Sequence, residues 1–341
     1  MKQLPVLRVL SLCAIAAALT FFSACKTKPE YPSDTRDALG TRVTIKLYVE
    51  GQAVDSYQRV FDQAFATMSH WEQMTLSRDA SNQVHKISEG AGVQSIIIDP
   101  TVFEMLMAAT RLNDSSGKLF DVRMGPLYDA WGFDGTPMVP DEATLANALS
   151  LVRDGGMFVA GKSILLAKEG MRFDVRQFVE GYVFDLIADQ LKEQGFTSFS
   201  IESPQVFICA GTPPDSRGFR FTLHNPDKAD TSWAYLDVPA GAYTYISPVN
   251  NRFEKGGQLY HSLLNPNTGL PVNNLAGAIV NADKAATAEA MAYALFVKNS
   301  DQEIPAKGQE MIKGRGLIHR EGQEYRSELS GSLADRLELI H

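Results

Sequence analysis

Cysteine is scarce in this sequence, and none of it is arranged as a cross-link or a metal site. Only Cys13, Cys25 and Cys209 occur in the 341 residues. The first two lie in an N-terminal segment that we interpret below as a signal and its cleavage site, so no intramolecular disulfide is expected in the mature chain. No group of cysteine and histidine residues has the spacing of a zinc site.

Common nucleotide-binding and hydrolase motifs are also missing. The sequence has no Gly-x-x-x-x-Gly-Lys-Ser/Thr, no Gly-x-Gly-x-x-Gly and no Gly-x-Ser-x-Gly, which excludes the motif-bearing forms of the P-loop, dinucleotide-binding and serine-hydrolase classes. The net charge is −8 and no basic stripe is present, so we do not expect binding to nucleic acid. No single short motif identifies the function.

The N-terminus resembles a bacterial lipoprotein signal. Positive residues flank an uncharged apolar run over 9–22, which is shorter than the roughly 20 residues of a membrane span. Ser23 and Ala24 precede Cys25, the order found in lipoprotein boxes, in which the cysteine is lipidated and becomes the mature N-terminus. We expect residues 1–24 to be the signal peptide, with Cys25 lipidated. The alternative is an ordinary cleaved signal with an incidental cysteine.

The segment after the signal is polar and contains two prolines, so residues 25–37 are predicted to be a tether. We therefore expect the protein to be attached by lipid to a bacterial membrane, facing the periplasm or the exterior. The remaining residues, 38–341, form one large predicted domain. Strand patterns, such as the alternating apolar residues of 43–47, mix with helix patterns, such as Ala285 to Val297, without a regular βαβ rhythm. The fold class expected is α+β.

One helix is the centre of this prediction. Asp174 is suited to cap a helix, and the residues that follow place apolar side chains at spacings of four on one face. These are Val179, Val183, Ile187 and Leu191. Gly181 costs about 1 kcal/mol inside a helix relative to alanine, so it indicates close approach by a ligand or by another backbone. Tight packing of the helix on its neighbours remains the alternative to a ligand site.

Five stretches, taken together and in order, resemble the FAD:protein FMN transferases, the ApbE-like bacterial lipoproteins. The resemblance covers about residues 38 to 330. The matching stretches are Leu39–Thr41, Gly117–Phe133, Asp174–Asp185, Leu264–Pro271 and Thr287–Val297. Each motif is weak alone, but the fixed order behind a lipoprotein signal is specific, and the chain is identified as a divergent member of that family.

The resemblance implies a function and its partners. Members bind FAD as substrate, cleave it between its phosphates, and attach FMN by a phosphoester to a threonine of a partner, here a flavin-acceptor protein of a membrane redox complex. They use magnesium (Mg2+), which offsets the negative charge of the pyrophosphate during phosphoryl transfer. Mg2+ prefers oxygen ligands in octahedral geometry.

The resemblance also assigns site residues in this sequence. The positions that match the FAD-contacting elements are Leu119, Phe120, Asp121, Asp174, Glu180 and Leu264. The positions that match the metal site are Gln177, through its backbone carbonyl, Glu289 and Tyr293. We expect the carboxylates of Asp121, Asp174 and Glu180 to lie in one cleft. No residue is assigned as catalytic.

The sequence departs from the family pattern at two of the metal-site positions and at two positions close to other motif residues. Glu289 replaces an aspartate, Tyr293 replaces a threonine, Arg123 replaces a threonine and Ser262 replaces a histidine. A longer carboxylate and a neutral phenol weaken the oxygen set that Mg2+ needs, so we expect Mg2+ to bind weakly or not at all. The sequence leaves three alternatives open: FMN transfer, a catalytically inactive flavin- or protein-binding lipoprotein, and an FAD pyrophosphatase.

Overall fold

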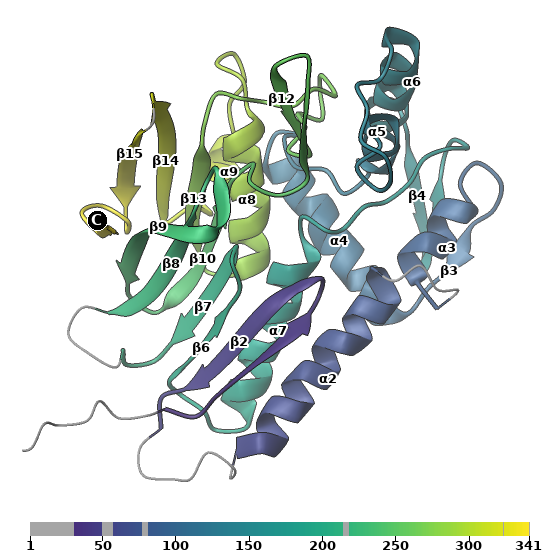
Figure 1. Cartoon of the computed structure of the whole chain (residues 1–341). Coiled ribbons are helices and arrows are strands. Elements are labelled where there is room, and N and C mark those ends of the chain that lie inside the picture. The colour runs from purple at the N-terminus through teal and green to yellow at the C-terminus, as the bar shows by residue number, and fades with distance from the viewer. Residues whose placement is uncertain (1–30, 50–56, 77–80, 214–217, 323, 341) are drawn as a thin grey trace, which may run out of the picture. The chain divides into compact units, whose positions relative to one another are not determined.

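An antiparallel sheet of eight strands is the centre of the domain. The computed structural model describes residues 31–49, 57–76, 81–213, 218–322 and 324–340 (Figure 1). In spatial order the strands are β1 (Ser33–Ala38), β2 (Thr41–Leu47), β6 (Phe199–Glu202), β7 (Val206–Ala210), β10 (Gly241–Ile246), β13 (Gly277–Ala282), β14 (Gly314–Glu321) and β15 (Glu324–Gly331). Each strand pairs antiparallel with its neighbours.

Helices cover one face of this sheet. Helix α8 (Ala285–Val297) packs on β10 and β13, and α7 (Val179–Glu193) packs on both α8 and β7. Helix α2 (Gln58–Thr75) packs on α7 and on the edge strand β1, and α4 (Pro100–Ser115) packs on α8 (Figure 1). Helix α8 is buried along its whole length apart from the half-buried Thr287, which explains why its sequence is hydrophobic all round rather than amphipathic.

A second sheet of three strands covers the other face. It consists of β8 (Phe219–Asn225), β9 (Lys228–Val238) and β16 (Leu337–Leu339), in the order β16-β9-β8. Phe207 in β7 points to this side and stacks on Phe221 in β8, with 5.2 Å between ring centroids, whereas Val206 and Ile208 join the core on the helical side. Because both faces are covered, β7 is apolar at successive positions rather than at alternate ones.

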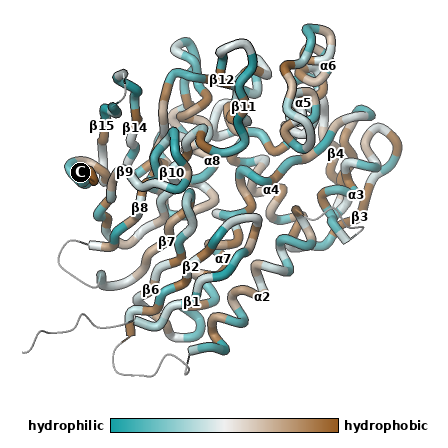
Figure 2. Tube along the Cα trace, in the orientation of Figure 1, coloured by the Kyte–Doolittle hydropathy of each residue, from teal (hydrophilic) through white to brown (hydrophobic). Residues whose placement is uncertain are grey.

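Shorter elements surround these layers. They are α3 (Gln83–Glu89), β3 (Ile96–Ile97), α5 (Gly125–Trp131), α6 (Glu142–Arg153), β4 (Met157–Ala160), β5 (Ser163–Leu166), β11 (Arg252–Lys255), β12 (Gln258–His261) and α9 (Ala306–Gln309). Trp131 at the end of α5 packs against Phe253 and Tyr260 of the β11–β12 hairpin, and these residues belong to a third core cluster. The ends of the hairpins β11–β12 and β14–β15 are hydrophilic (Figure 2).

The α+β class is confirmed, and residues Pro32–His341 form one compact unit. The predicted strand over 43–47 and the predicted helix Ala285–Val297 are both present. The tether predicted over 25–37 is too long, because Ser33–Ala38 form β1 and pair with β2. A polar sequence is suited to this strand because it lies at the sheet edge, where alternate side chains are exposed.

The N-terminal predictions fall on residues that the structure does not describe. The signal peptide over 1–24, Cys25 and the first part of the tether belong to residues 1–30, which lie outside the described residues. Within the described part of the chain, none of the helices combines the length and the apolar composition needed to cross a membrane.

Candidate functional site

A cleft of about 860 Å³ opens at the N-terminal end of α7. Its walls come from distant parts of the chain: the β1–β2 turn, the end of α2, the start of α3, the segment 172–177, and loops that follow β6, β10 and β12. Three of the predicted site residues line it, namely Asp174, Gln177 and Glu180. Loops that gather at one helix end in this way form a concave surface of the size that holds small-molecule ligands.

The charges around this cleft are unbalanced. Among the described residues that line it, five carry carboxylates, and two carry guanidinium groups, Arg172 and Arg176. The five acidic residues are Glu72, Asp129, Asp134, Asp174 and Glu180. An anionic ligand is repelled by these carboxylates and attracted by the two guanidinium groups, and both effects are strong where water is partly excluded.

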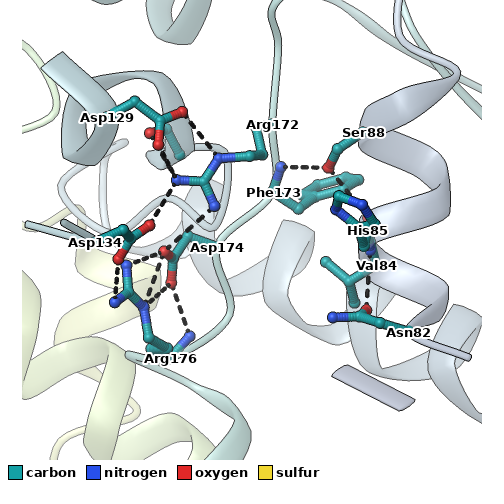
Figure 3. A network of polar contacts seen from close by, with 11 residues as sticks. Asn82, Val84, His85, Ser88, Asp129, Asp134, Arg172, Phe173, Asp174 and Arg176 are labelled. Carbon is teal, nitrogen blue, oxygen red and sulfur yellow. Dashed lines mark hydrogen bonds and ion pairs between the residues drawn. The ribbon is translucent and has the colours of Figure 1, made fainter. Parts of the chain in front are cut away.

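Both guanidinium groups belong to one network of ion pairs (Figure 3). Arg172 donates to both carboxylate oxygens of Asp129, at 3.0 and 2.7 Å, and to Asp134 at 3.0 Å. Arg176 pairs with Asp134 at 2.5 Å and with Asp174 through its Nε at 3.0 Å. Asn82, His85 and Ser88 stand on the opposite side in Figure 3, and residues of both sides line the cleft.

Asp174 belongs to a four-residue sequence, Phe-Asp-Val-Arg, that occurs twice, at 120–123 and 173–176. Both copies fold alike: the aspartate accepts the backbone N–H of the arginine two residues later and also its guanidinium, at 2.8 and 2.9 Å for Asp121 and at 3.1 and 3.0 Å for Asp174. The copies are joined by a bond of 2.6 Å from the N–H of Asp174 to the carbonyl of Val122. Each carboxylate is therefore neutralised within its own segment.

Asp121 does not share the cleft with Asp174 and Glu180. It is held by Arg123, whose Nη1 also donates to the carbonyl of Gly155 at 3.1 Å, and it is absent from the residues that line the cleft. Of the three carboxylates expected in one cleft, Asp174 and Glu180 line it and Asp121 does not. Arg123, which replaces the threonine of the family pattern, explains where the third carboxylate is directed.

Three further predicted residues are part of the core. Leu119 and Phe120 are 1% exposed and Leu264 is fully buried. Phe120 meets the ring of Tyr293 edge-on at 6.2 Å, and the carbonyl of Leu264 accepts a hydrogen bond of 2.7 Å from the Tyr293 hydroxyl. None of the three lines the cleft. In this structure all three pack in the core, Phe120 and Leu264 next to Tyr293.

Glu180 is the least satisfied polar group of the site. It lies in the first turn of α7 and is 7% exposed, and its Oε1 has no hydrogen-bond partner within the described structure. Burial raises the pKa of its carboxyl to about 7, although the Ser203 hydroxyl beside it acts in the opposite direction. A buried oxygen without a partner costs free energy, so Glu180 is a natural contact for a ligand that enters the cleft.

Comparison with known proteins decides which family this arrangement belongs to. The model of the ApbE family matches residues 39–314, which is most of the chain. The chain belongs to the ApbE family. Among its relatives, the FAD:protein FMN transferase of Vibrio cholerae is 23% identical over 293 residues, covering 84% of this chain and 87% of the relative. The enzyme of the same name from Klebsiella pneumoniae is 24% identical over 242 residues, covering 69% and 72%.

Solved structures agree with this assignment at the level of the fold. The ApbE protein of Thermotoga maritima has a TM-score of 0.74 at 19% identity and covers 87% of this chain and 96% of its own. The apo form of the flavinyl transferase ApbE from Pseudomonas stutzeri has the same TM-score at 20% identity, with coverage of 92% and 98%. This ApbE-family chain therefore shares the fold of these structures over most of its length.

The residues that the family resemblance assigns to Mg2+ do not fit the ion in this ApbE-family chain. Oε2 of Glu289 accepts the Gly181 N–H at 2.8 Å, and the Tyr293 hydroxyl donates to Leu264. Burial and the neighbouring Glu180 raise the pKa of the Glu289 carboxyl well above its ordinary value. A carboxyl whose charged form is disfavoured by burial and a neutral phenol are poor ligands for Mg2+, and no group of three or more His, Cys, Asp or Glu in the described ranges is arranged to hold a metal.

The helix that carries Glu180 differs from its prediction at one end. Helix α7 begins at Val179 rather than after Asp174, and no side chain caps it. Asp174 cannot serve as the cap because its carboxylate is bound by Arg176. The predicted apolar face, with Val179, Val183, Ile187 and Leu191, is buried as expected. Sequence reasoning did not find Arg172, Asp129 or Asp134 as site residues, because they meet only in the folded chain.

Proposed function

We propose that this chain binds FAD in the cleft at the start of α7 and transfers FMN to a threonine of a partner protein. The proposal is supported by membership of the ApbE family. It is also supported by relatives named FAD:protein FMN transferase, which this chain matches over most of their length. The observation that carries it is a cleft of about 860 Å³ whose wall holds the buried carboxyl of Glu180, one oxygen of which, Oε1, has no partner in the described structure. A cleft of this size lies in the upper part of the range for small-molecule sites.

The transfer itself needs little covalent chemistry from the protein. A threonine oxygen of the acceptor forms a bond to the FMN phosphorus, the bond between that phosphorus and the bridging oxygen breaks, AMP leaves, and the hydroxyl proton passes to solvent or to a base. Positioning and charge compensation carry such reactions. We derive no step through Mg2+, because the residues assigned to it do not fit the ion.

A second candidate is flavin binding without transfer. It is favoured by the internal hydrogen bonds of Glu289 and Tyr293, which direct both side chains away from a ligand. Bound FAD would then remain intact. The FAD pyrophosphatase alternative differs from both candidates, since it would release AMP and free FMN without an acceptor.

One experiment separates these outcomes. The purified chain is incubated with FAD, with and without Mg2+, and with a flavin-acceptor protein, and the products are analysed by mass spectrometry. A gain of FMN on the acceptor together with AMP supports transfer; free FMN with AMP identifies a pyrophosphatase; intact bound FAD identifies a binding protein. Failure to bind FAD would refute the proposal. Glu180→Gln tests the cleft, and Glu142→Gln on the exposed start of α6 is the matched control.

We also propose that the chain is anchored to a bacterial membrane, facing the periplasm or the exterior, by a lipid on Cys25. The proposal is supported by the order of charge, apolar run and small residues before Cys25. Cys25→Ser should move the protein from the membrane fraction to the soluble fraction. The same partition between fractions for the variant and the wild type would refute the anchor.

A further inference from the structure

The positive charge of the cleft is concentrated in one place. Among the described residues that line it, Arg172 and Arg176 are the two with permanent positive charge. Their side chains are 28% and 38% exposed, so both are within reach of a ligand. Guanidinium groups bind phosphate oxygens through paired, charge-assisted hydrogen bonds. Among the described lining residues, no other cationic group offers a diphosphate a contact of comparable strength.

We propose that Arg172 and Arg176 hold the diphosphate of FAD in this chain without a metal ion, and that Asp129 and Asp134 occupy those guanidinium groups until the diphosphate replaces them. The inference rests on the proposed function, because it concerns how FAD is held. It follows from two observations: the two side chains assigned to Mg2+, Glu289 and Tyr293, are engaged inside the protein, and the arginine pair lies in the cleft wall.

The three aspartates of the network are not equivalent. The Asp174 side chain is 3% exposed and is bound through both oxygens by Arg176, so it is a fixed partner that orients this guanidinium. Asp129 and Asp134 have side chains that are 56% and 30% exposed. Ion pairs between exposed groups contribute little to stability because water solvates the separated charges well. Asp129 and Asp134 can therefore release their guanidinium partners at low cost.

The two exposed aspartates bind the arginines as a ligand phosphate would. Asp129 takes two parallel N–H groups of Arg172, at 3.0 and 2.7 Å, and Asp134 bridges Arg172 and Arg176 at 3.0 and 2.5 Å. Together the two carboxylates present oxygens to both guanidinium groups (Figure 3). A diphosphate offers the same number of negative charges. It can replace the two carboxylates without leaving either guanidinium unpaired.

Removing one competing carboxylate should therefore strengthen FAD binding. Asp134→Asn removes one negative charge from the cleft while preserving shape, and the Kd for FAD should fall about 3- to 10-fold. Asp189→Asn is the matched control. Asp189 is also an exposed aspartate that pairs with cations, Lys192 and Lys284, but it lies toward the other end of α7 and does not line the cleft. The control should leave the Kd for FAD unchanged.

The arginines provide the opposite test. Arg176→Gln should raise the Kd for FAD about 10- to 100-fold, since charge-assisted hydrogen bonds to the diphosphate are lost. Arg176→Gln also leaves Asp174 without its main partner and can impair folding, so the gain expected for Asp134→Asn provides independent support. Riboflavin, which has no phosphate, should bind the wild type, Asp134→Asn and Arg176→Gln equally.

The measurement is titration calorimetry with FAD and with riboflavin, in buffer with EDTA and in buffer with Mg2+. We expect the Kd for FAD to be the same in both buffers and to respond to Asp134→Asn and Arg176→Gln as described. FAD binding that disappears in EDTA, or that is the same in Asp134→Asn as in Asp189→Asn, would overturn the inference and leave the proposed function standing. No FAD binding by any variant in either buffer would overturn both.

Discussion

The backbone N–H of Gly181 donates a hydrogen bond of 2.8 Å to Oε2 of Glu289. This bond joins the first turn of α7 to α8, and it requires close approach of the two helices. A Cβ at position 181 would lie 2.7 Å from both the carbonyl carbon and the oxygen of Ala285, and 2.8 Å from Glu289. The glycine therefore serves contact with another backbone, which was one of the alternatives that the sequence left open.

Gly181→Ala should destabilise the protein in spite of alanine's better helix propensity. Overpacking against a backbone costs about 1–3 kcal/mol, whereas alanine gains about 1 kcal/mol over glycine in a helix. The atoms that a Cβ would meet belong to the Ala285 backbone, which cannot rotate aside, so the cost lies in the upper part of that range. The Gly181→Ala variant should therefore lose about 1–2 kcal/mol of unfolding free energy, measured by urea denaturation. Gly135→Ala is the control, because a Cβ there meets nothing within 4 Å. Equal stability of the two variants would contradict the close approach.

The buried carboxyl of Glu180 should make stability depend on pH. Burial raises its pKa from 4.5 to about 7 in the folded chain, so the folded state binds the proton more tightly than the unfolded state. The stabilisation that the protonated Glu180 carboxyl gives the folded state is fully present below pH 4.5, and it is lost as pH rises toward and beyond 7. Glu180→Gln should therefore be more stable than the wild type by about 2–3 kcal/mol at pH 8 relative to pH 5. The measurement is urea denaturation at both pH values, and an equal difference at both would refute it.

The parts of the fold that could be predicted from the sequence are those set by local pattern. The face of α7 with Val183, Ile187 and Leu191 was predicted from spacing alone and is buried. The start of α7 was predicted wrongly at Asp174, because the guanidinium of Arg176, two residues later, takes the carboxylate that would have capped the helix. The β11–β12 hairpin was not predicted, although Gly256-Gly257, with φ of 64° and 76°, is a turn sequence suited to a hairpin.

The site was predictable only where a motif carried the residue. Asp174, Gln177 and Glu180 lie on one segment, and all three line the cleft. Arg172 and Asp129 are 43 positions apart and meet through two bonds, so no spacing rule relates them. Whether Glu289 has a free oxygen likewise depends on the packing of α7 on α8, which a single sequence does not specify.

Tyr293 should prove to be a packing residue rather than a metal ligand. It is 1% exposed, and its hydroxyl is bonded to the Leu264 carbonyl. Tyr293→Phe leaves that buried carbonyl unsatisfied and should cost about 1–3 kcal/mol in urea denaturation. Titration calorimetry with Mg2+ should show equally weak binding for Tyr293→Phe and the wild type. Tight Mg2+ binding by the wild type that is lost in the variant would contradict this assignment.

His261 should oppose Glu180 in its effect on stability. It is fully buried at the end of β12; its Nδ1 accepts the Leu263 N–H at 3.2 Å, and its Nε2 lies 3.0 Å from Oδ1 of Asn273. Since Nδ1 is the acceptor, Nε2 carries the proton and donates to Asn273. Burial lowers the pKa of the ring from 6.5 to about 4. Protonation of Nδ1 would break the bond from Leu263.

Because the pKa of His261 is lower in the folded chain, the unfolded state takes up the proton first as pH falls. The stabilisation from the neutral ring is therefore fully present above pH 6.5 and is lost as pH falls toward 4. The loss for the wild type between pH 7 and pH 5 should be about 2 kcal/mol from this residue. His261→Gln removes the titrating ring and should lack this component, while His85→Gln on the exposed side of α3 controls for histidine replacement as such. A ring resonance of His261 that titrates near pH 6.5 in the folded chain would show that the ring is not held neutral by burial.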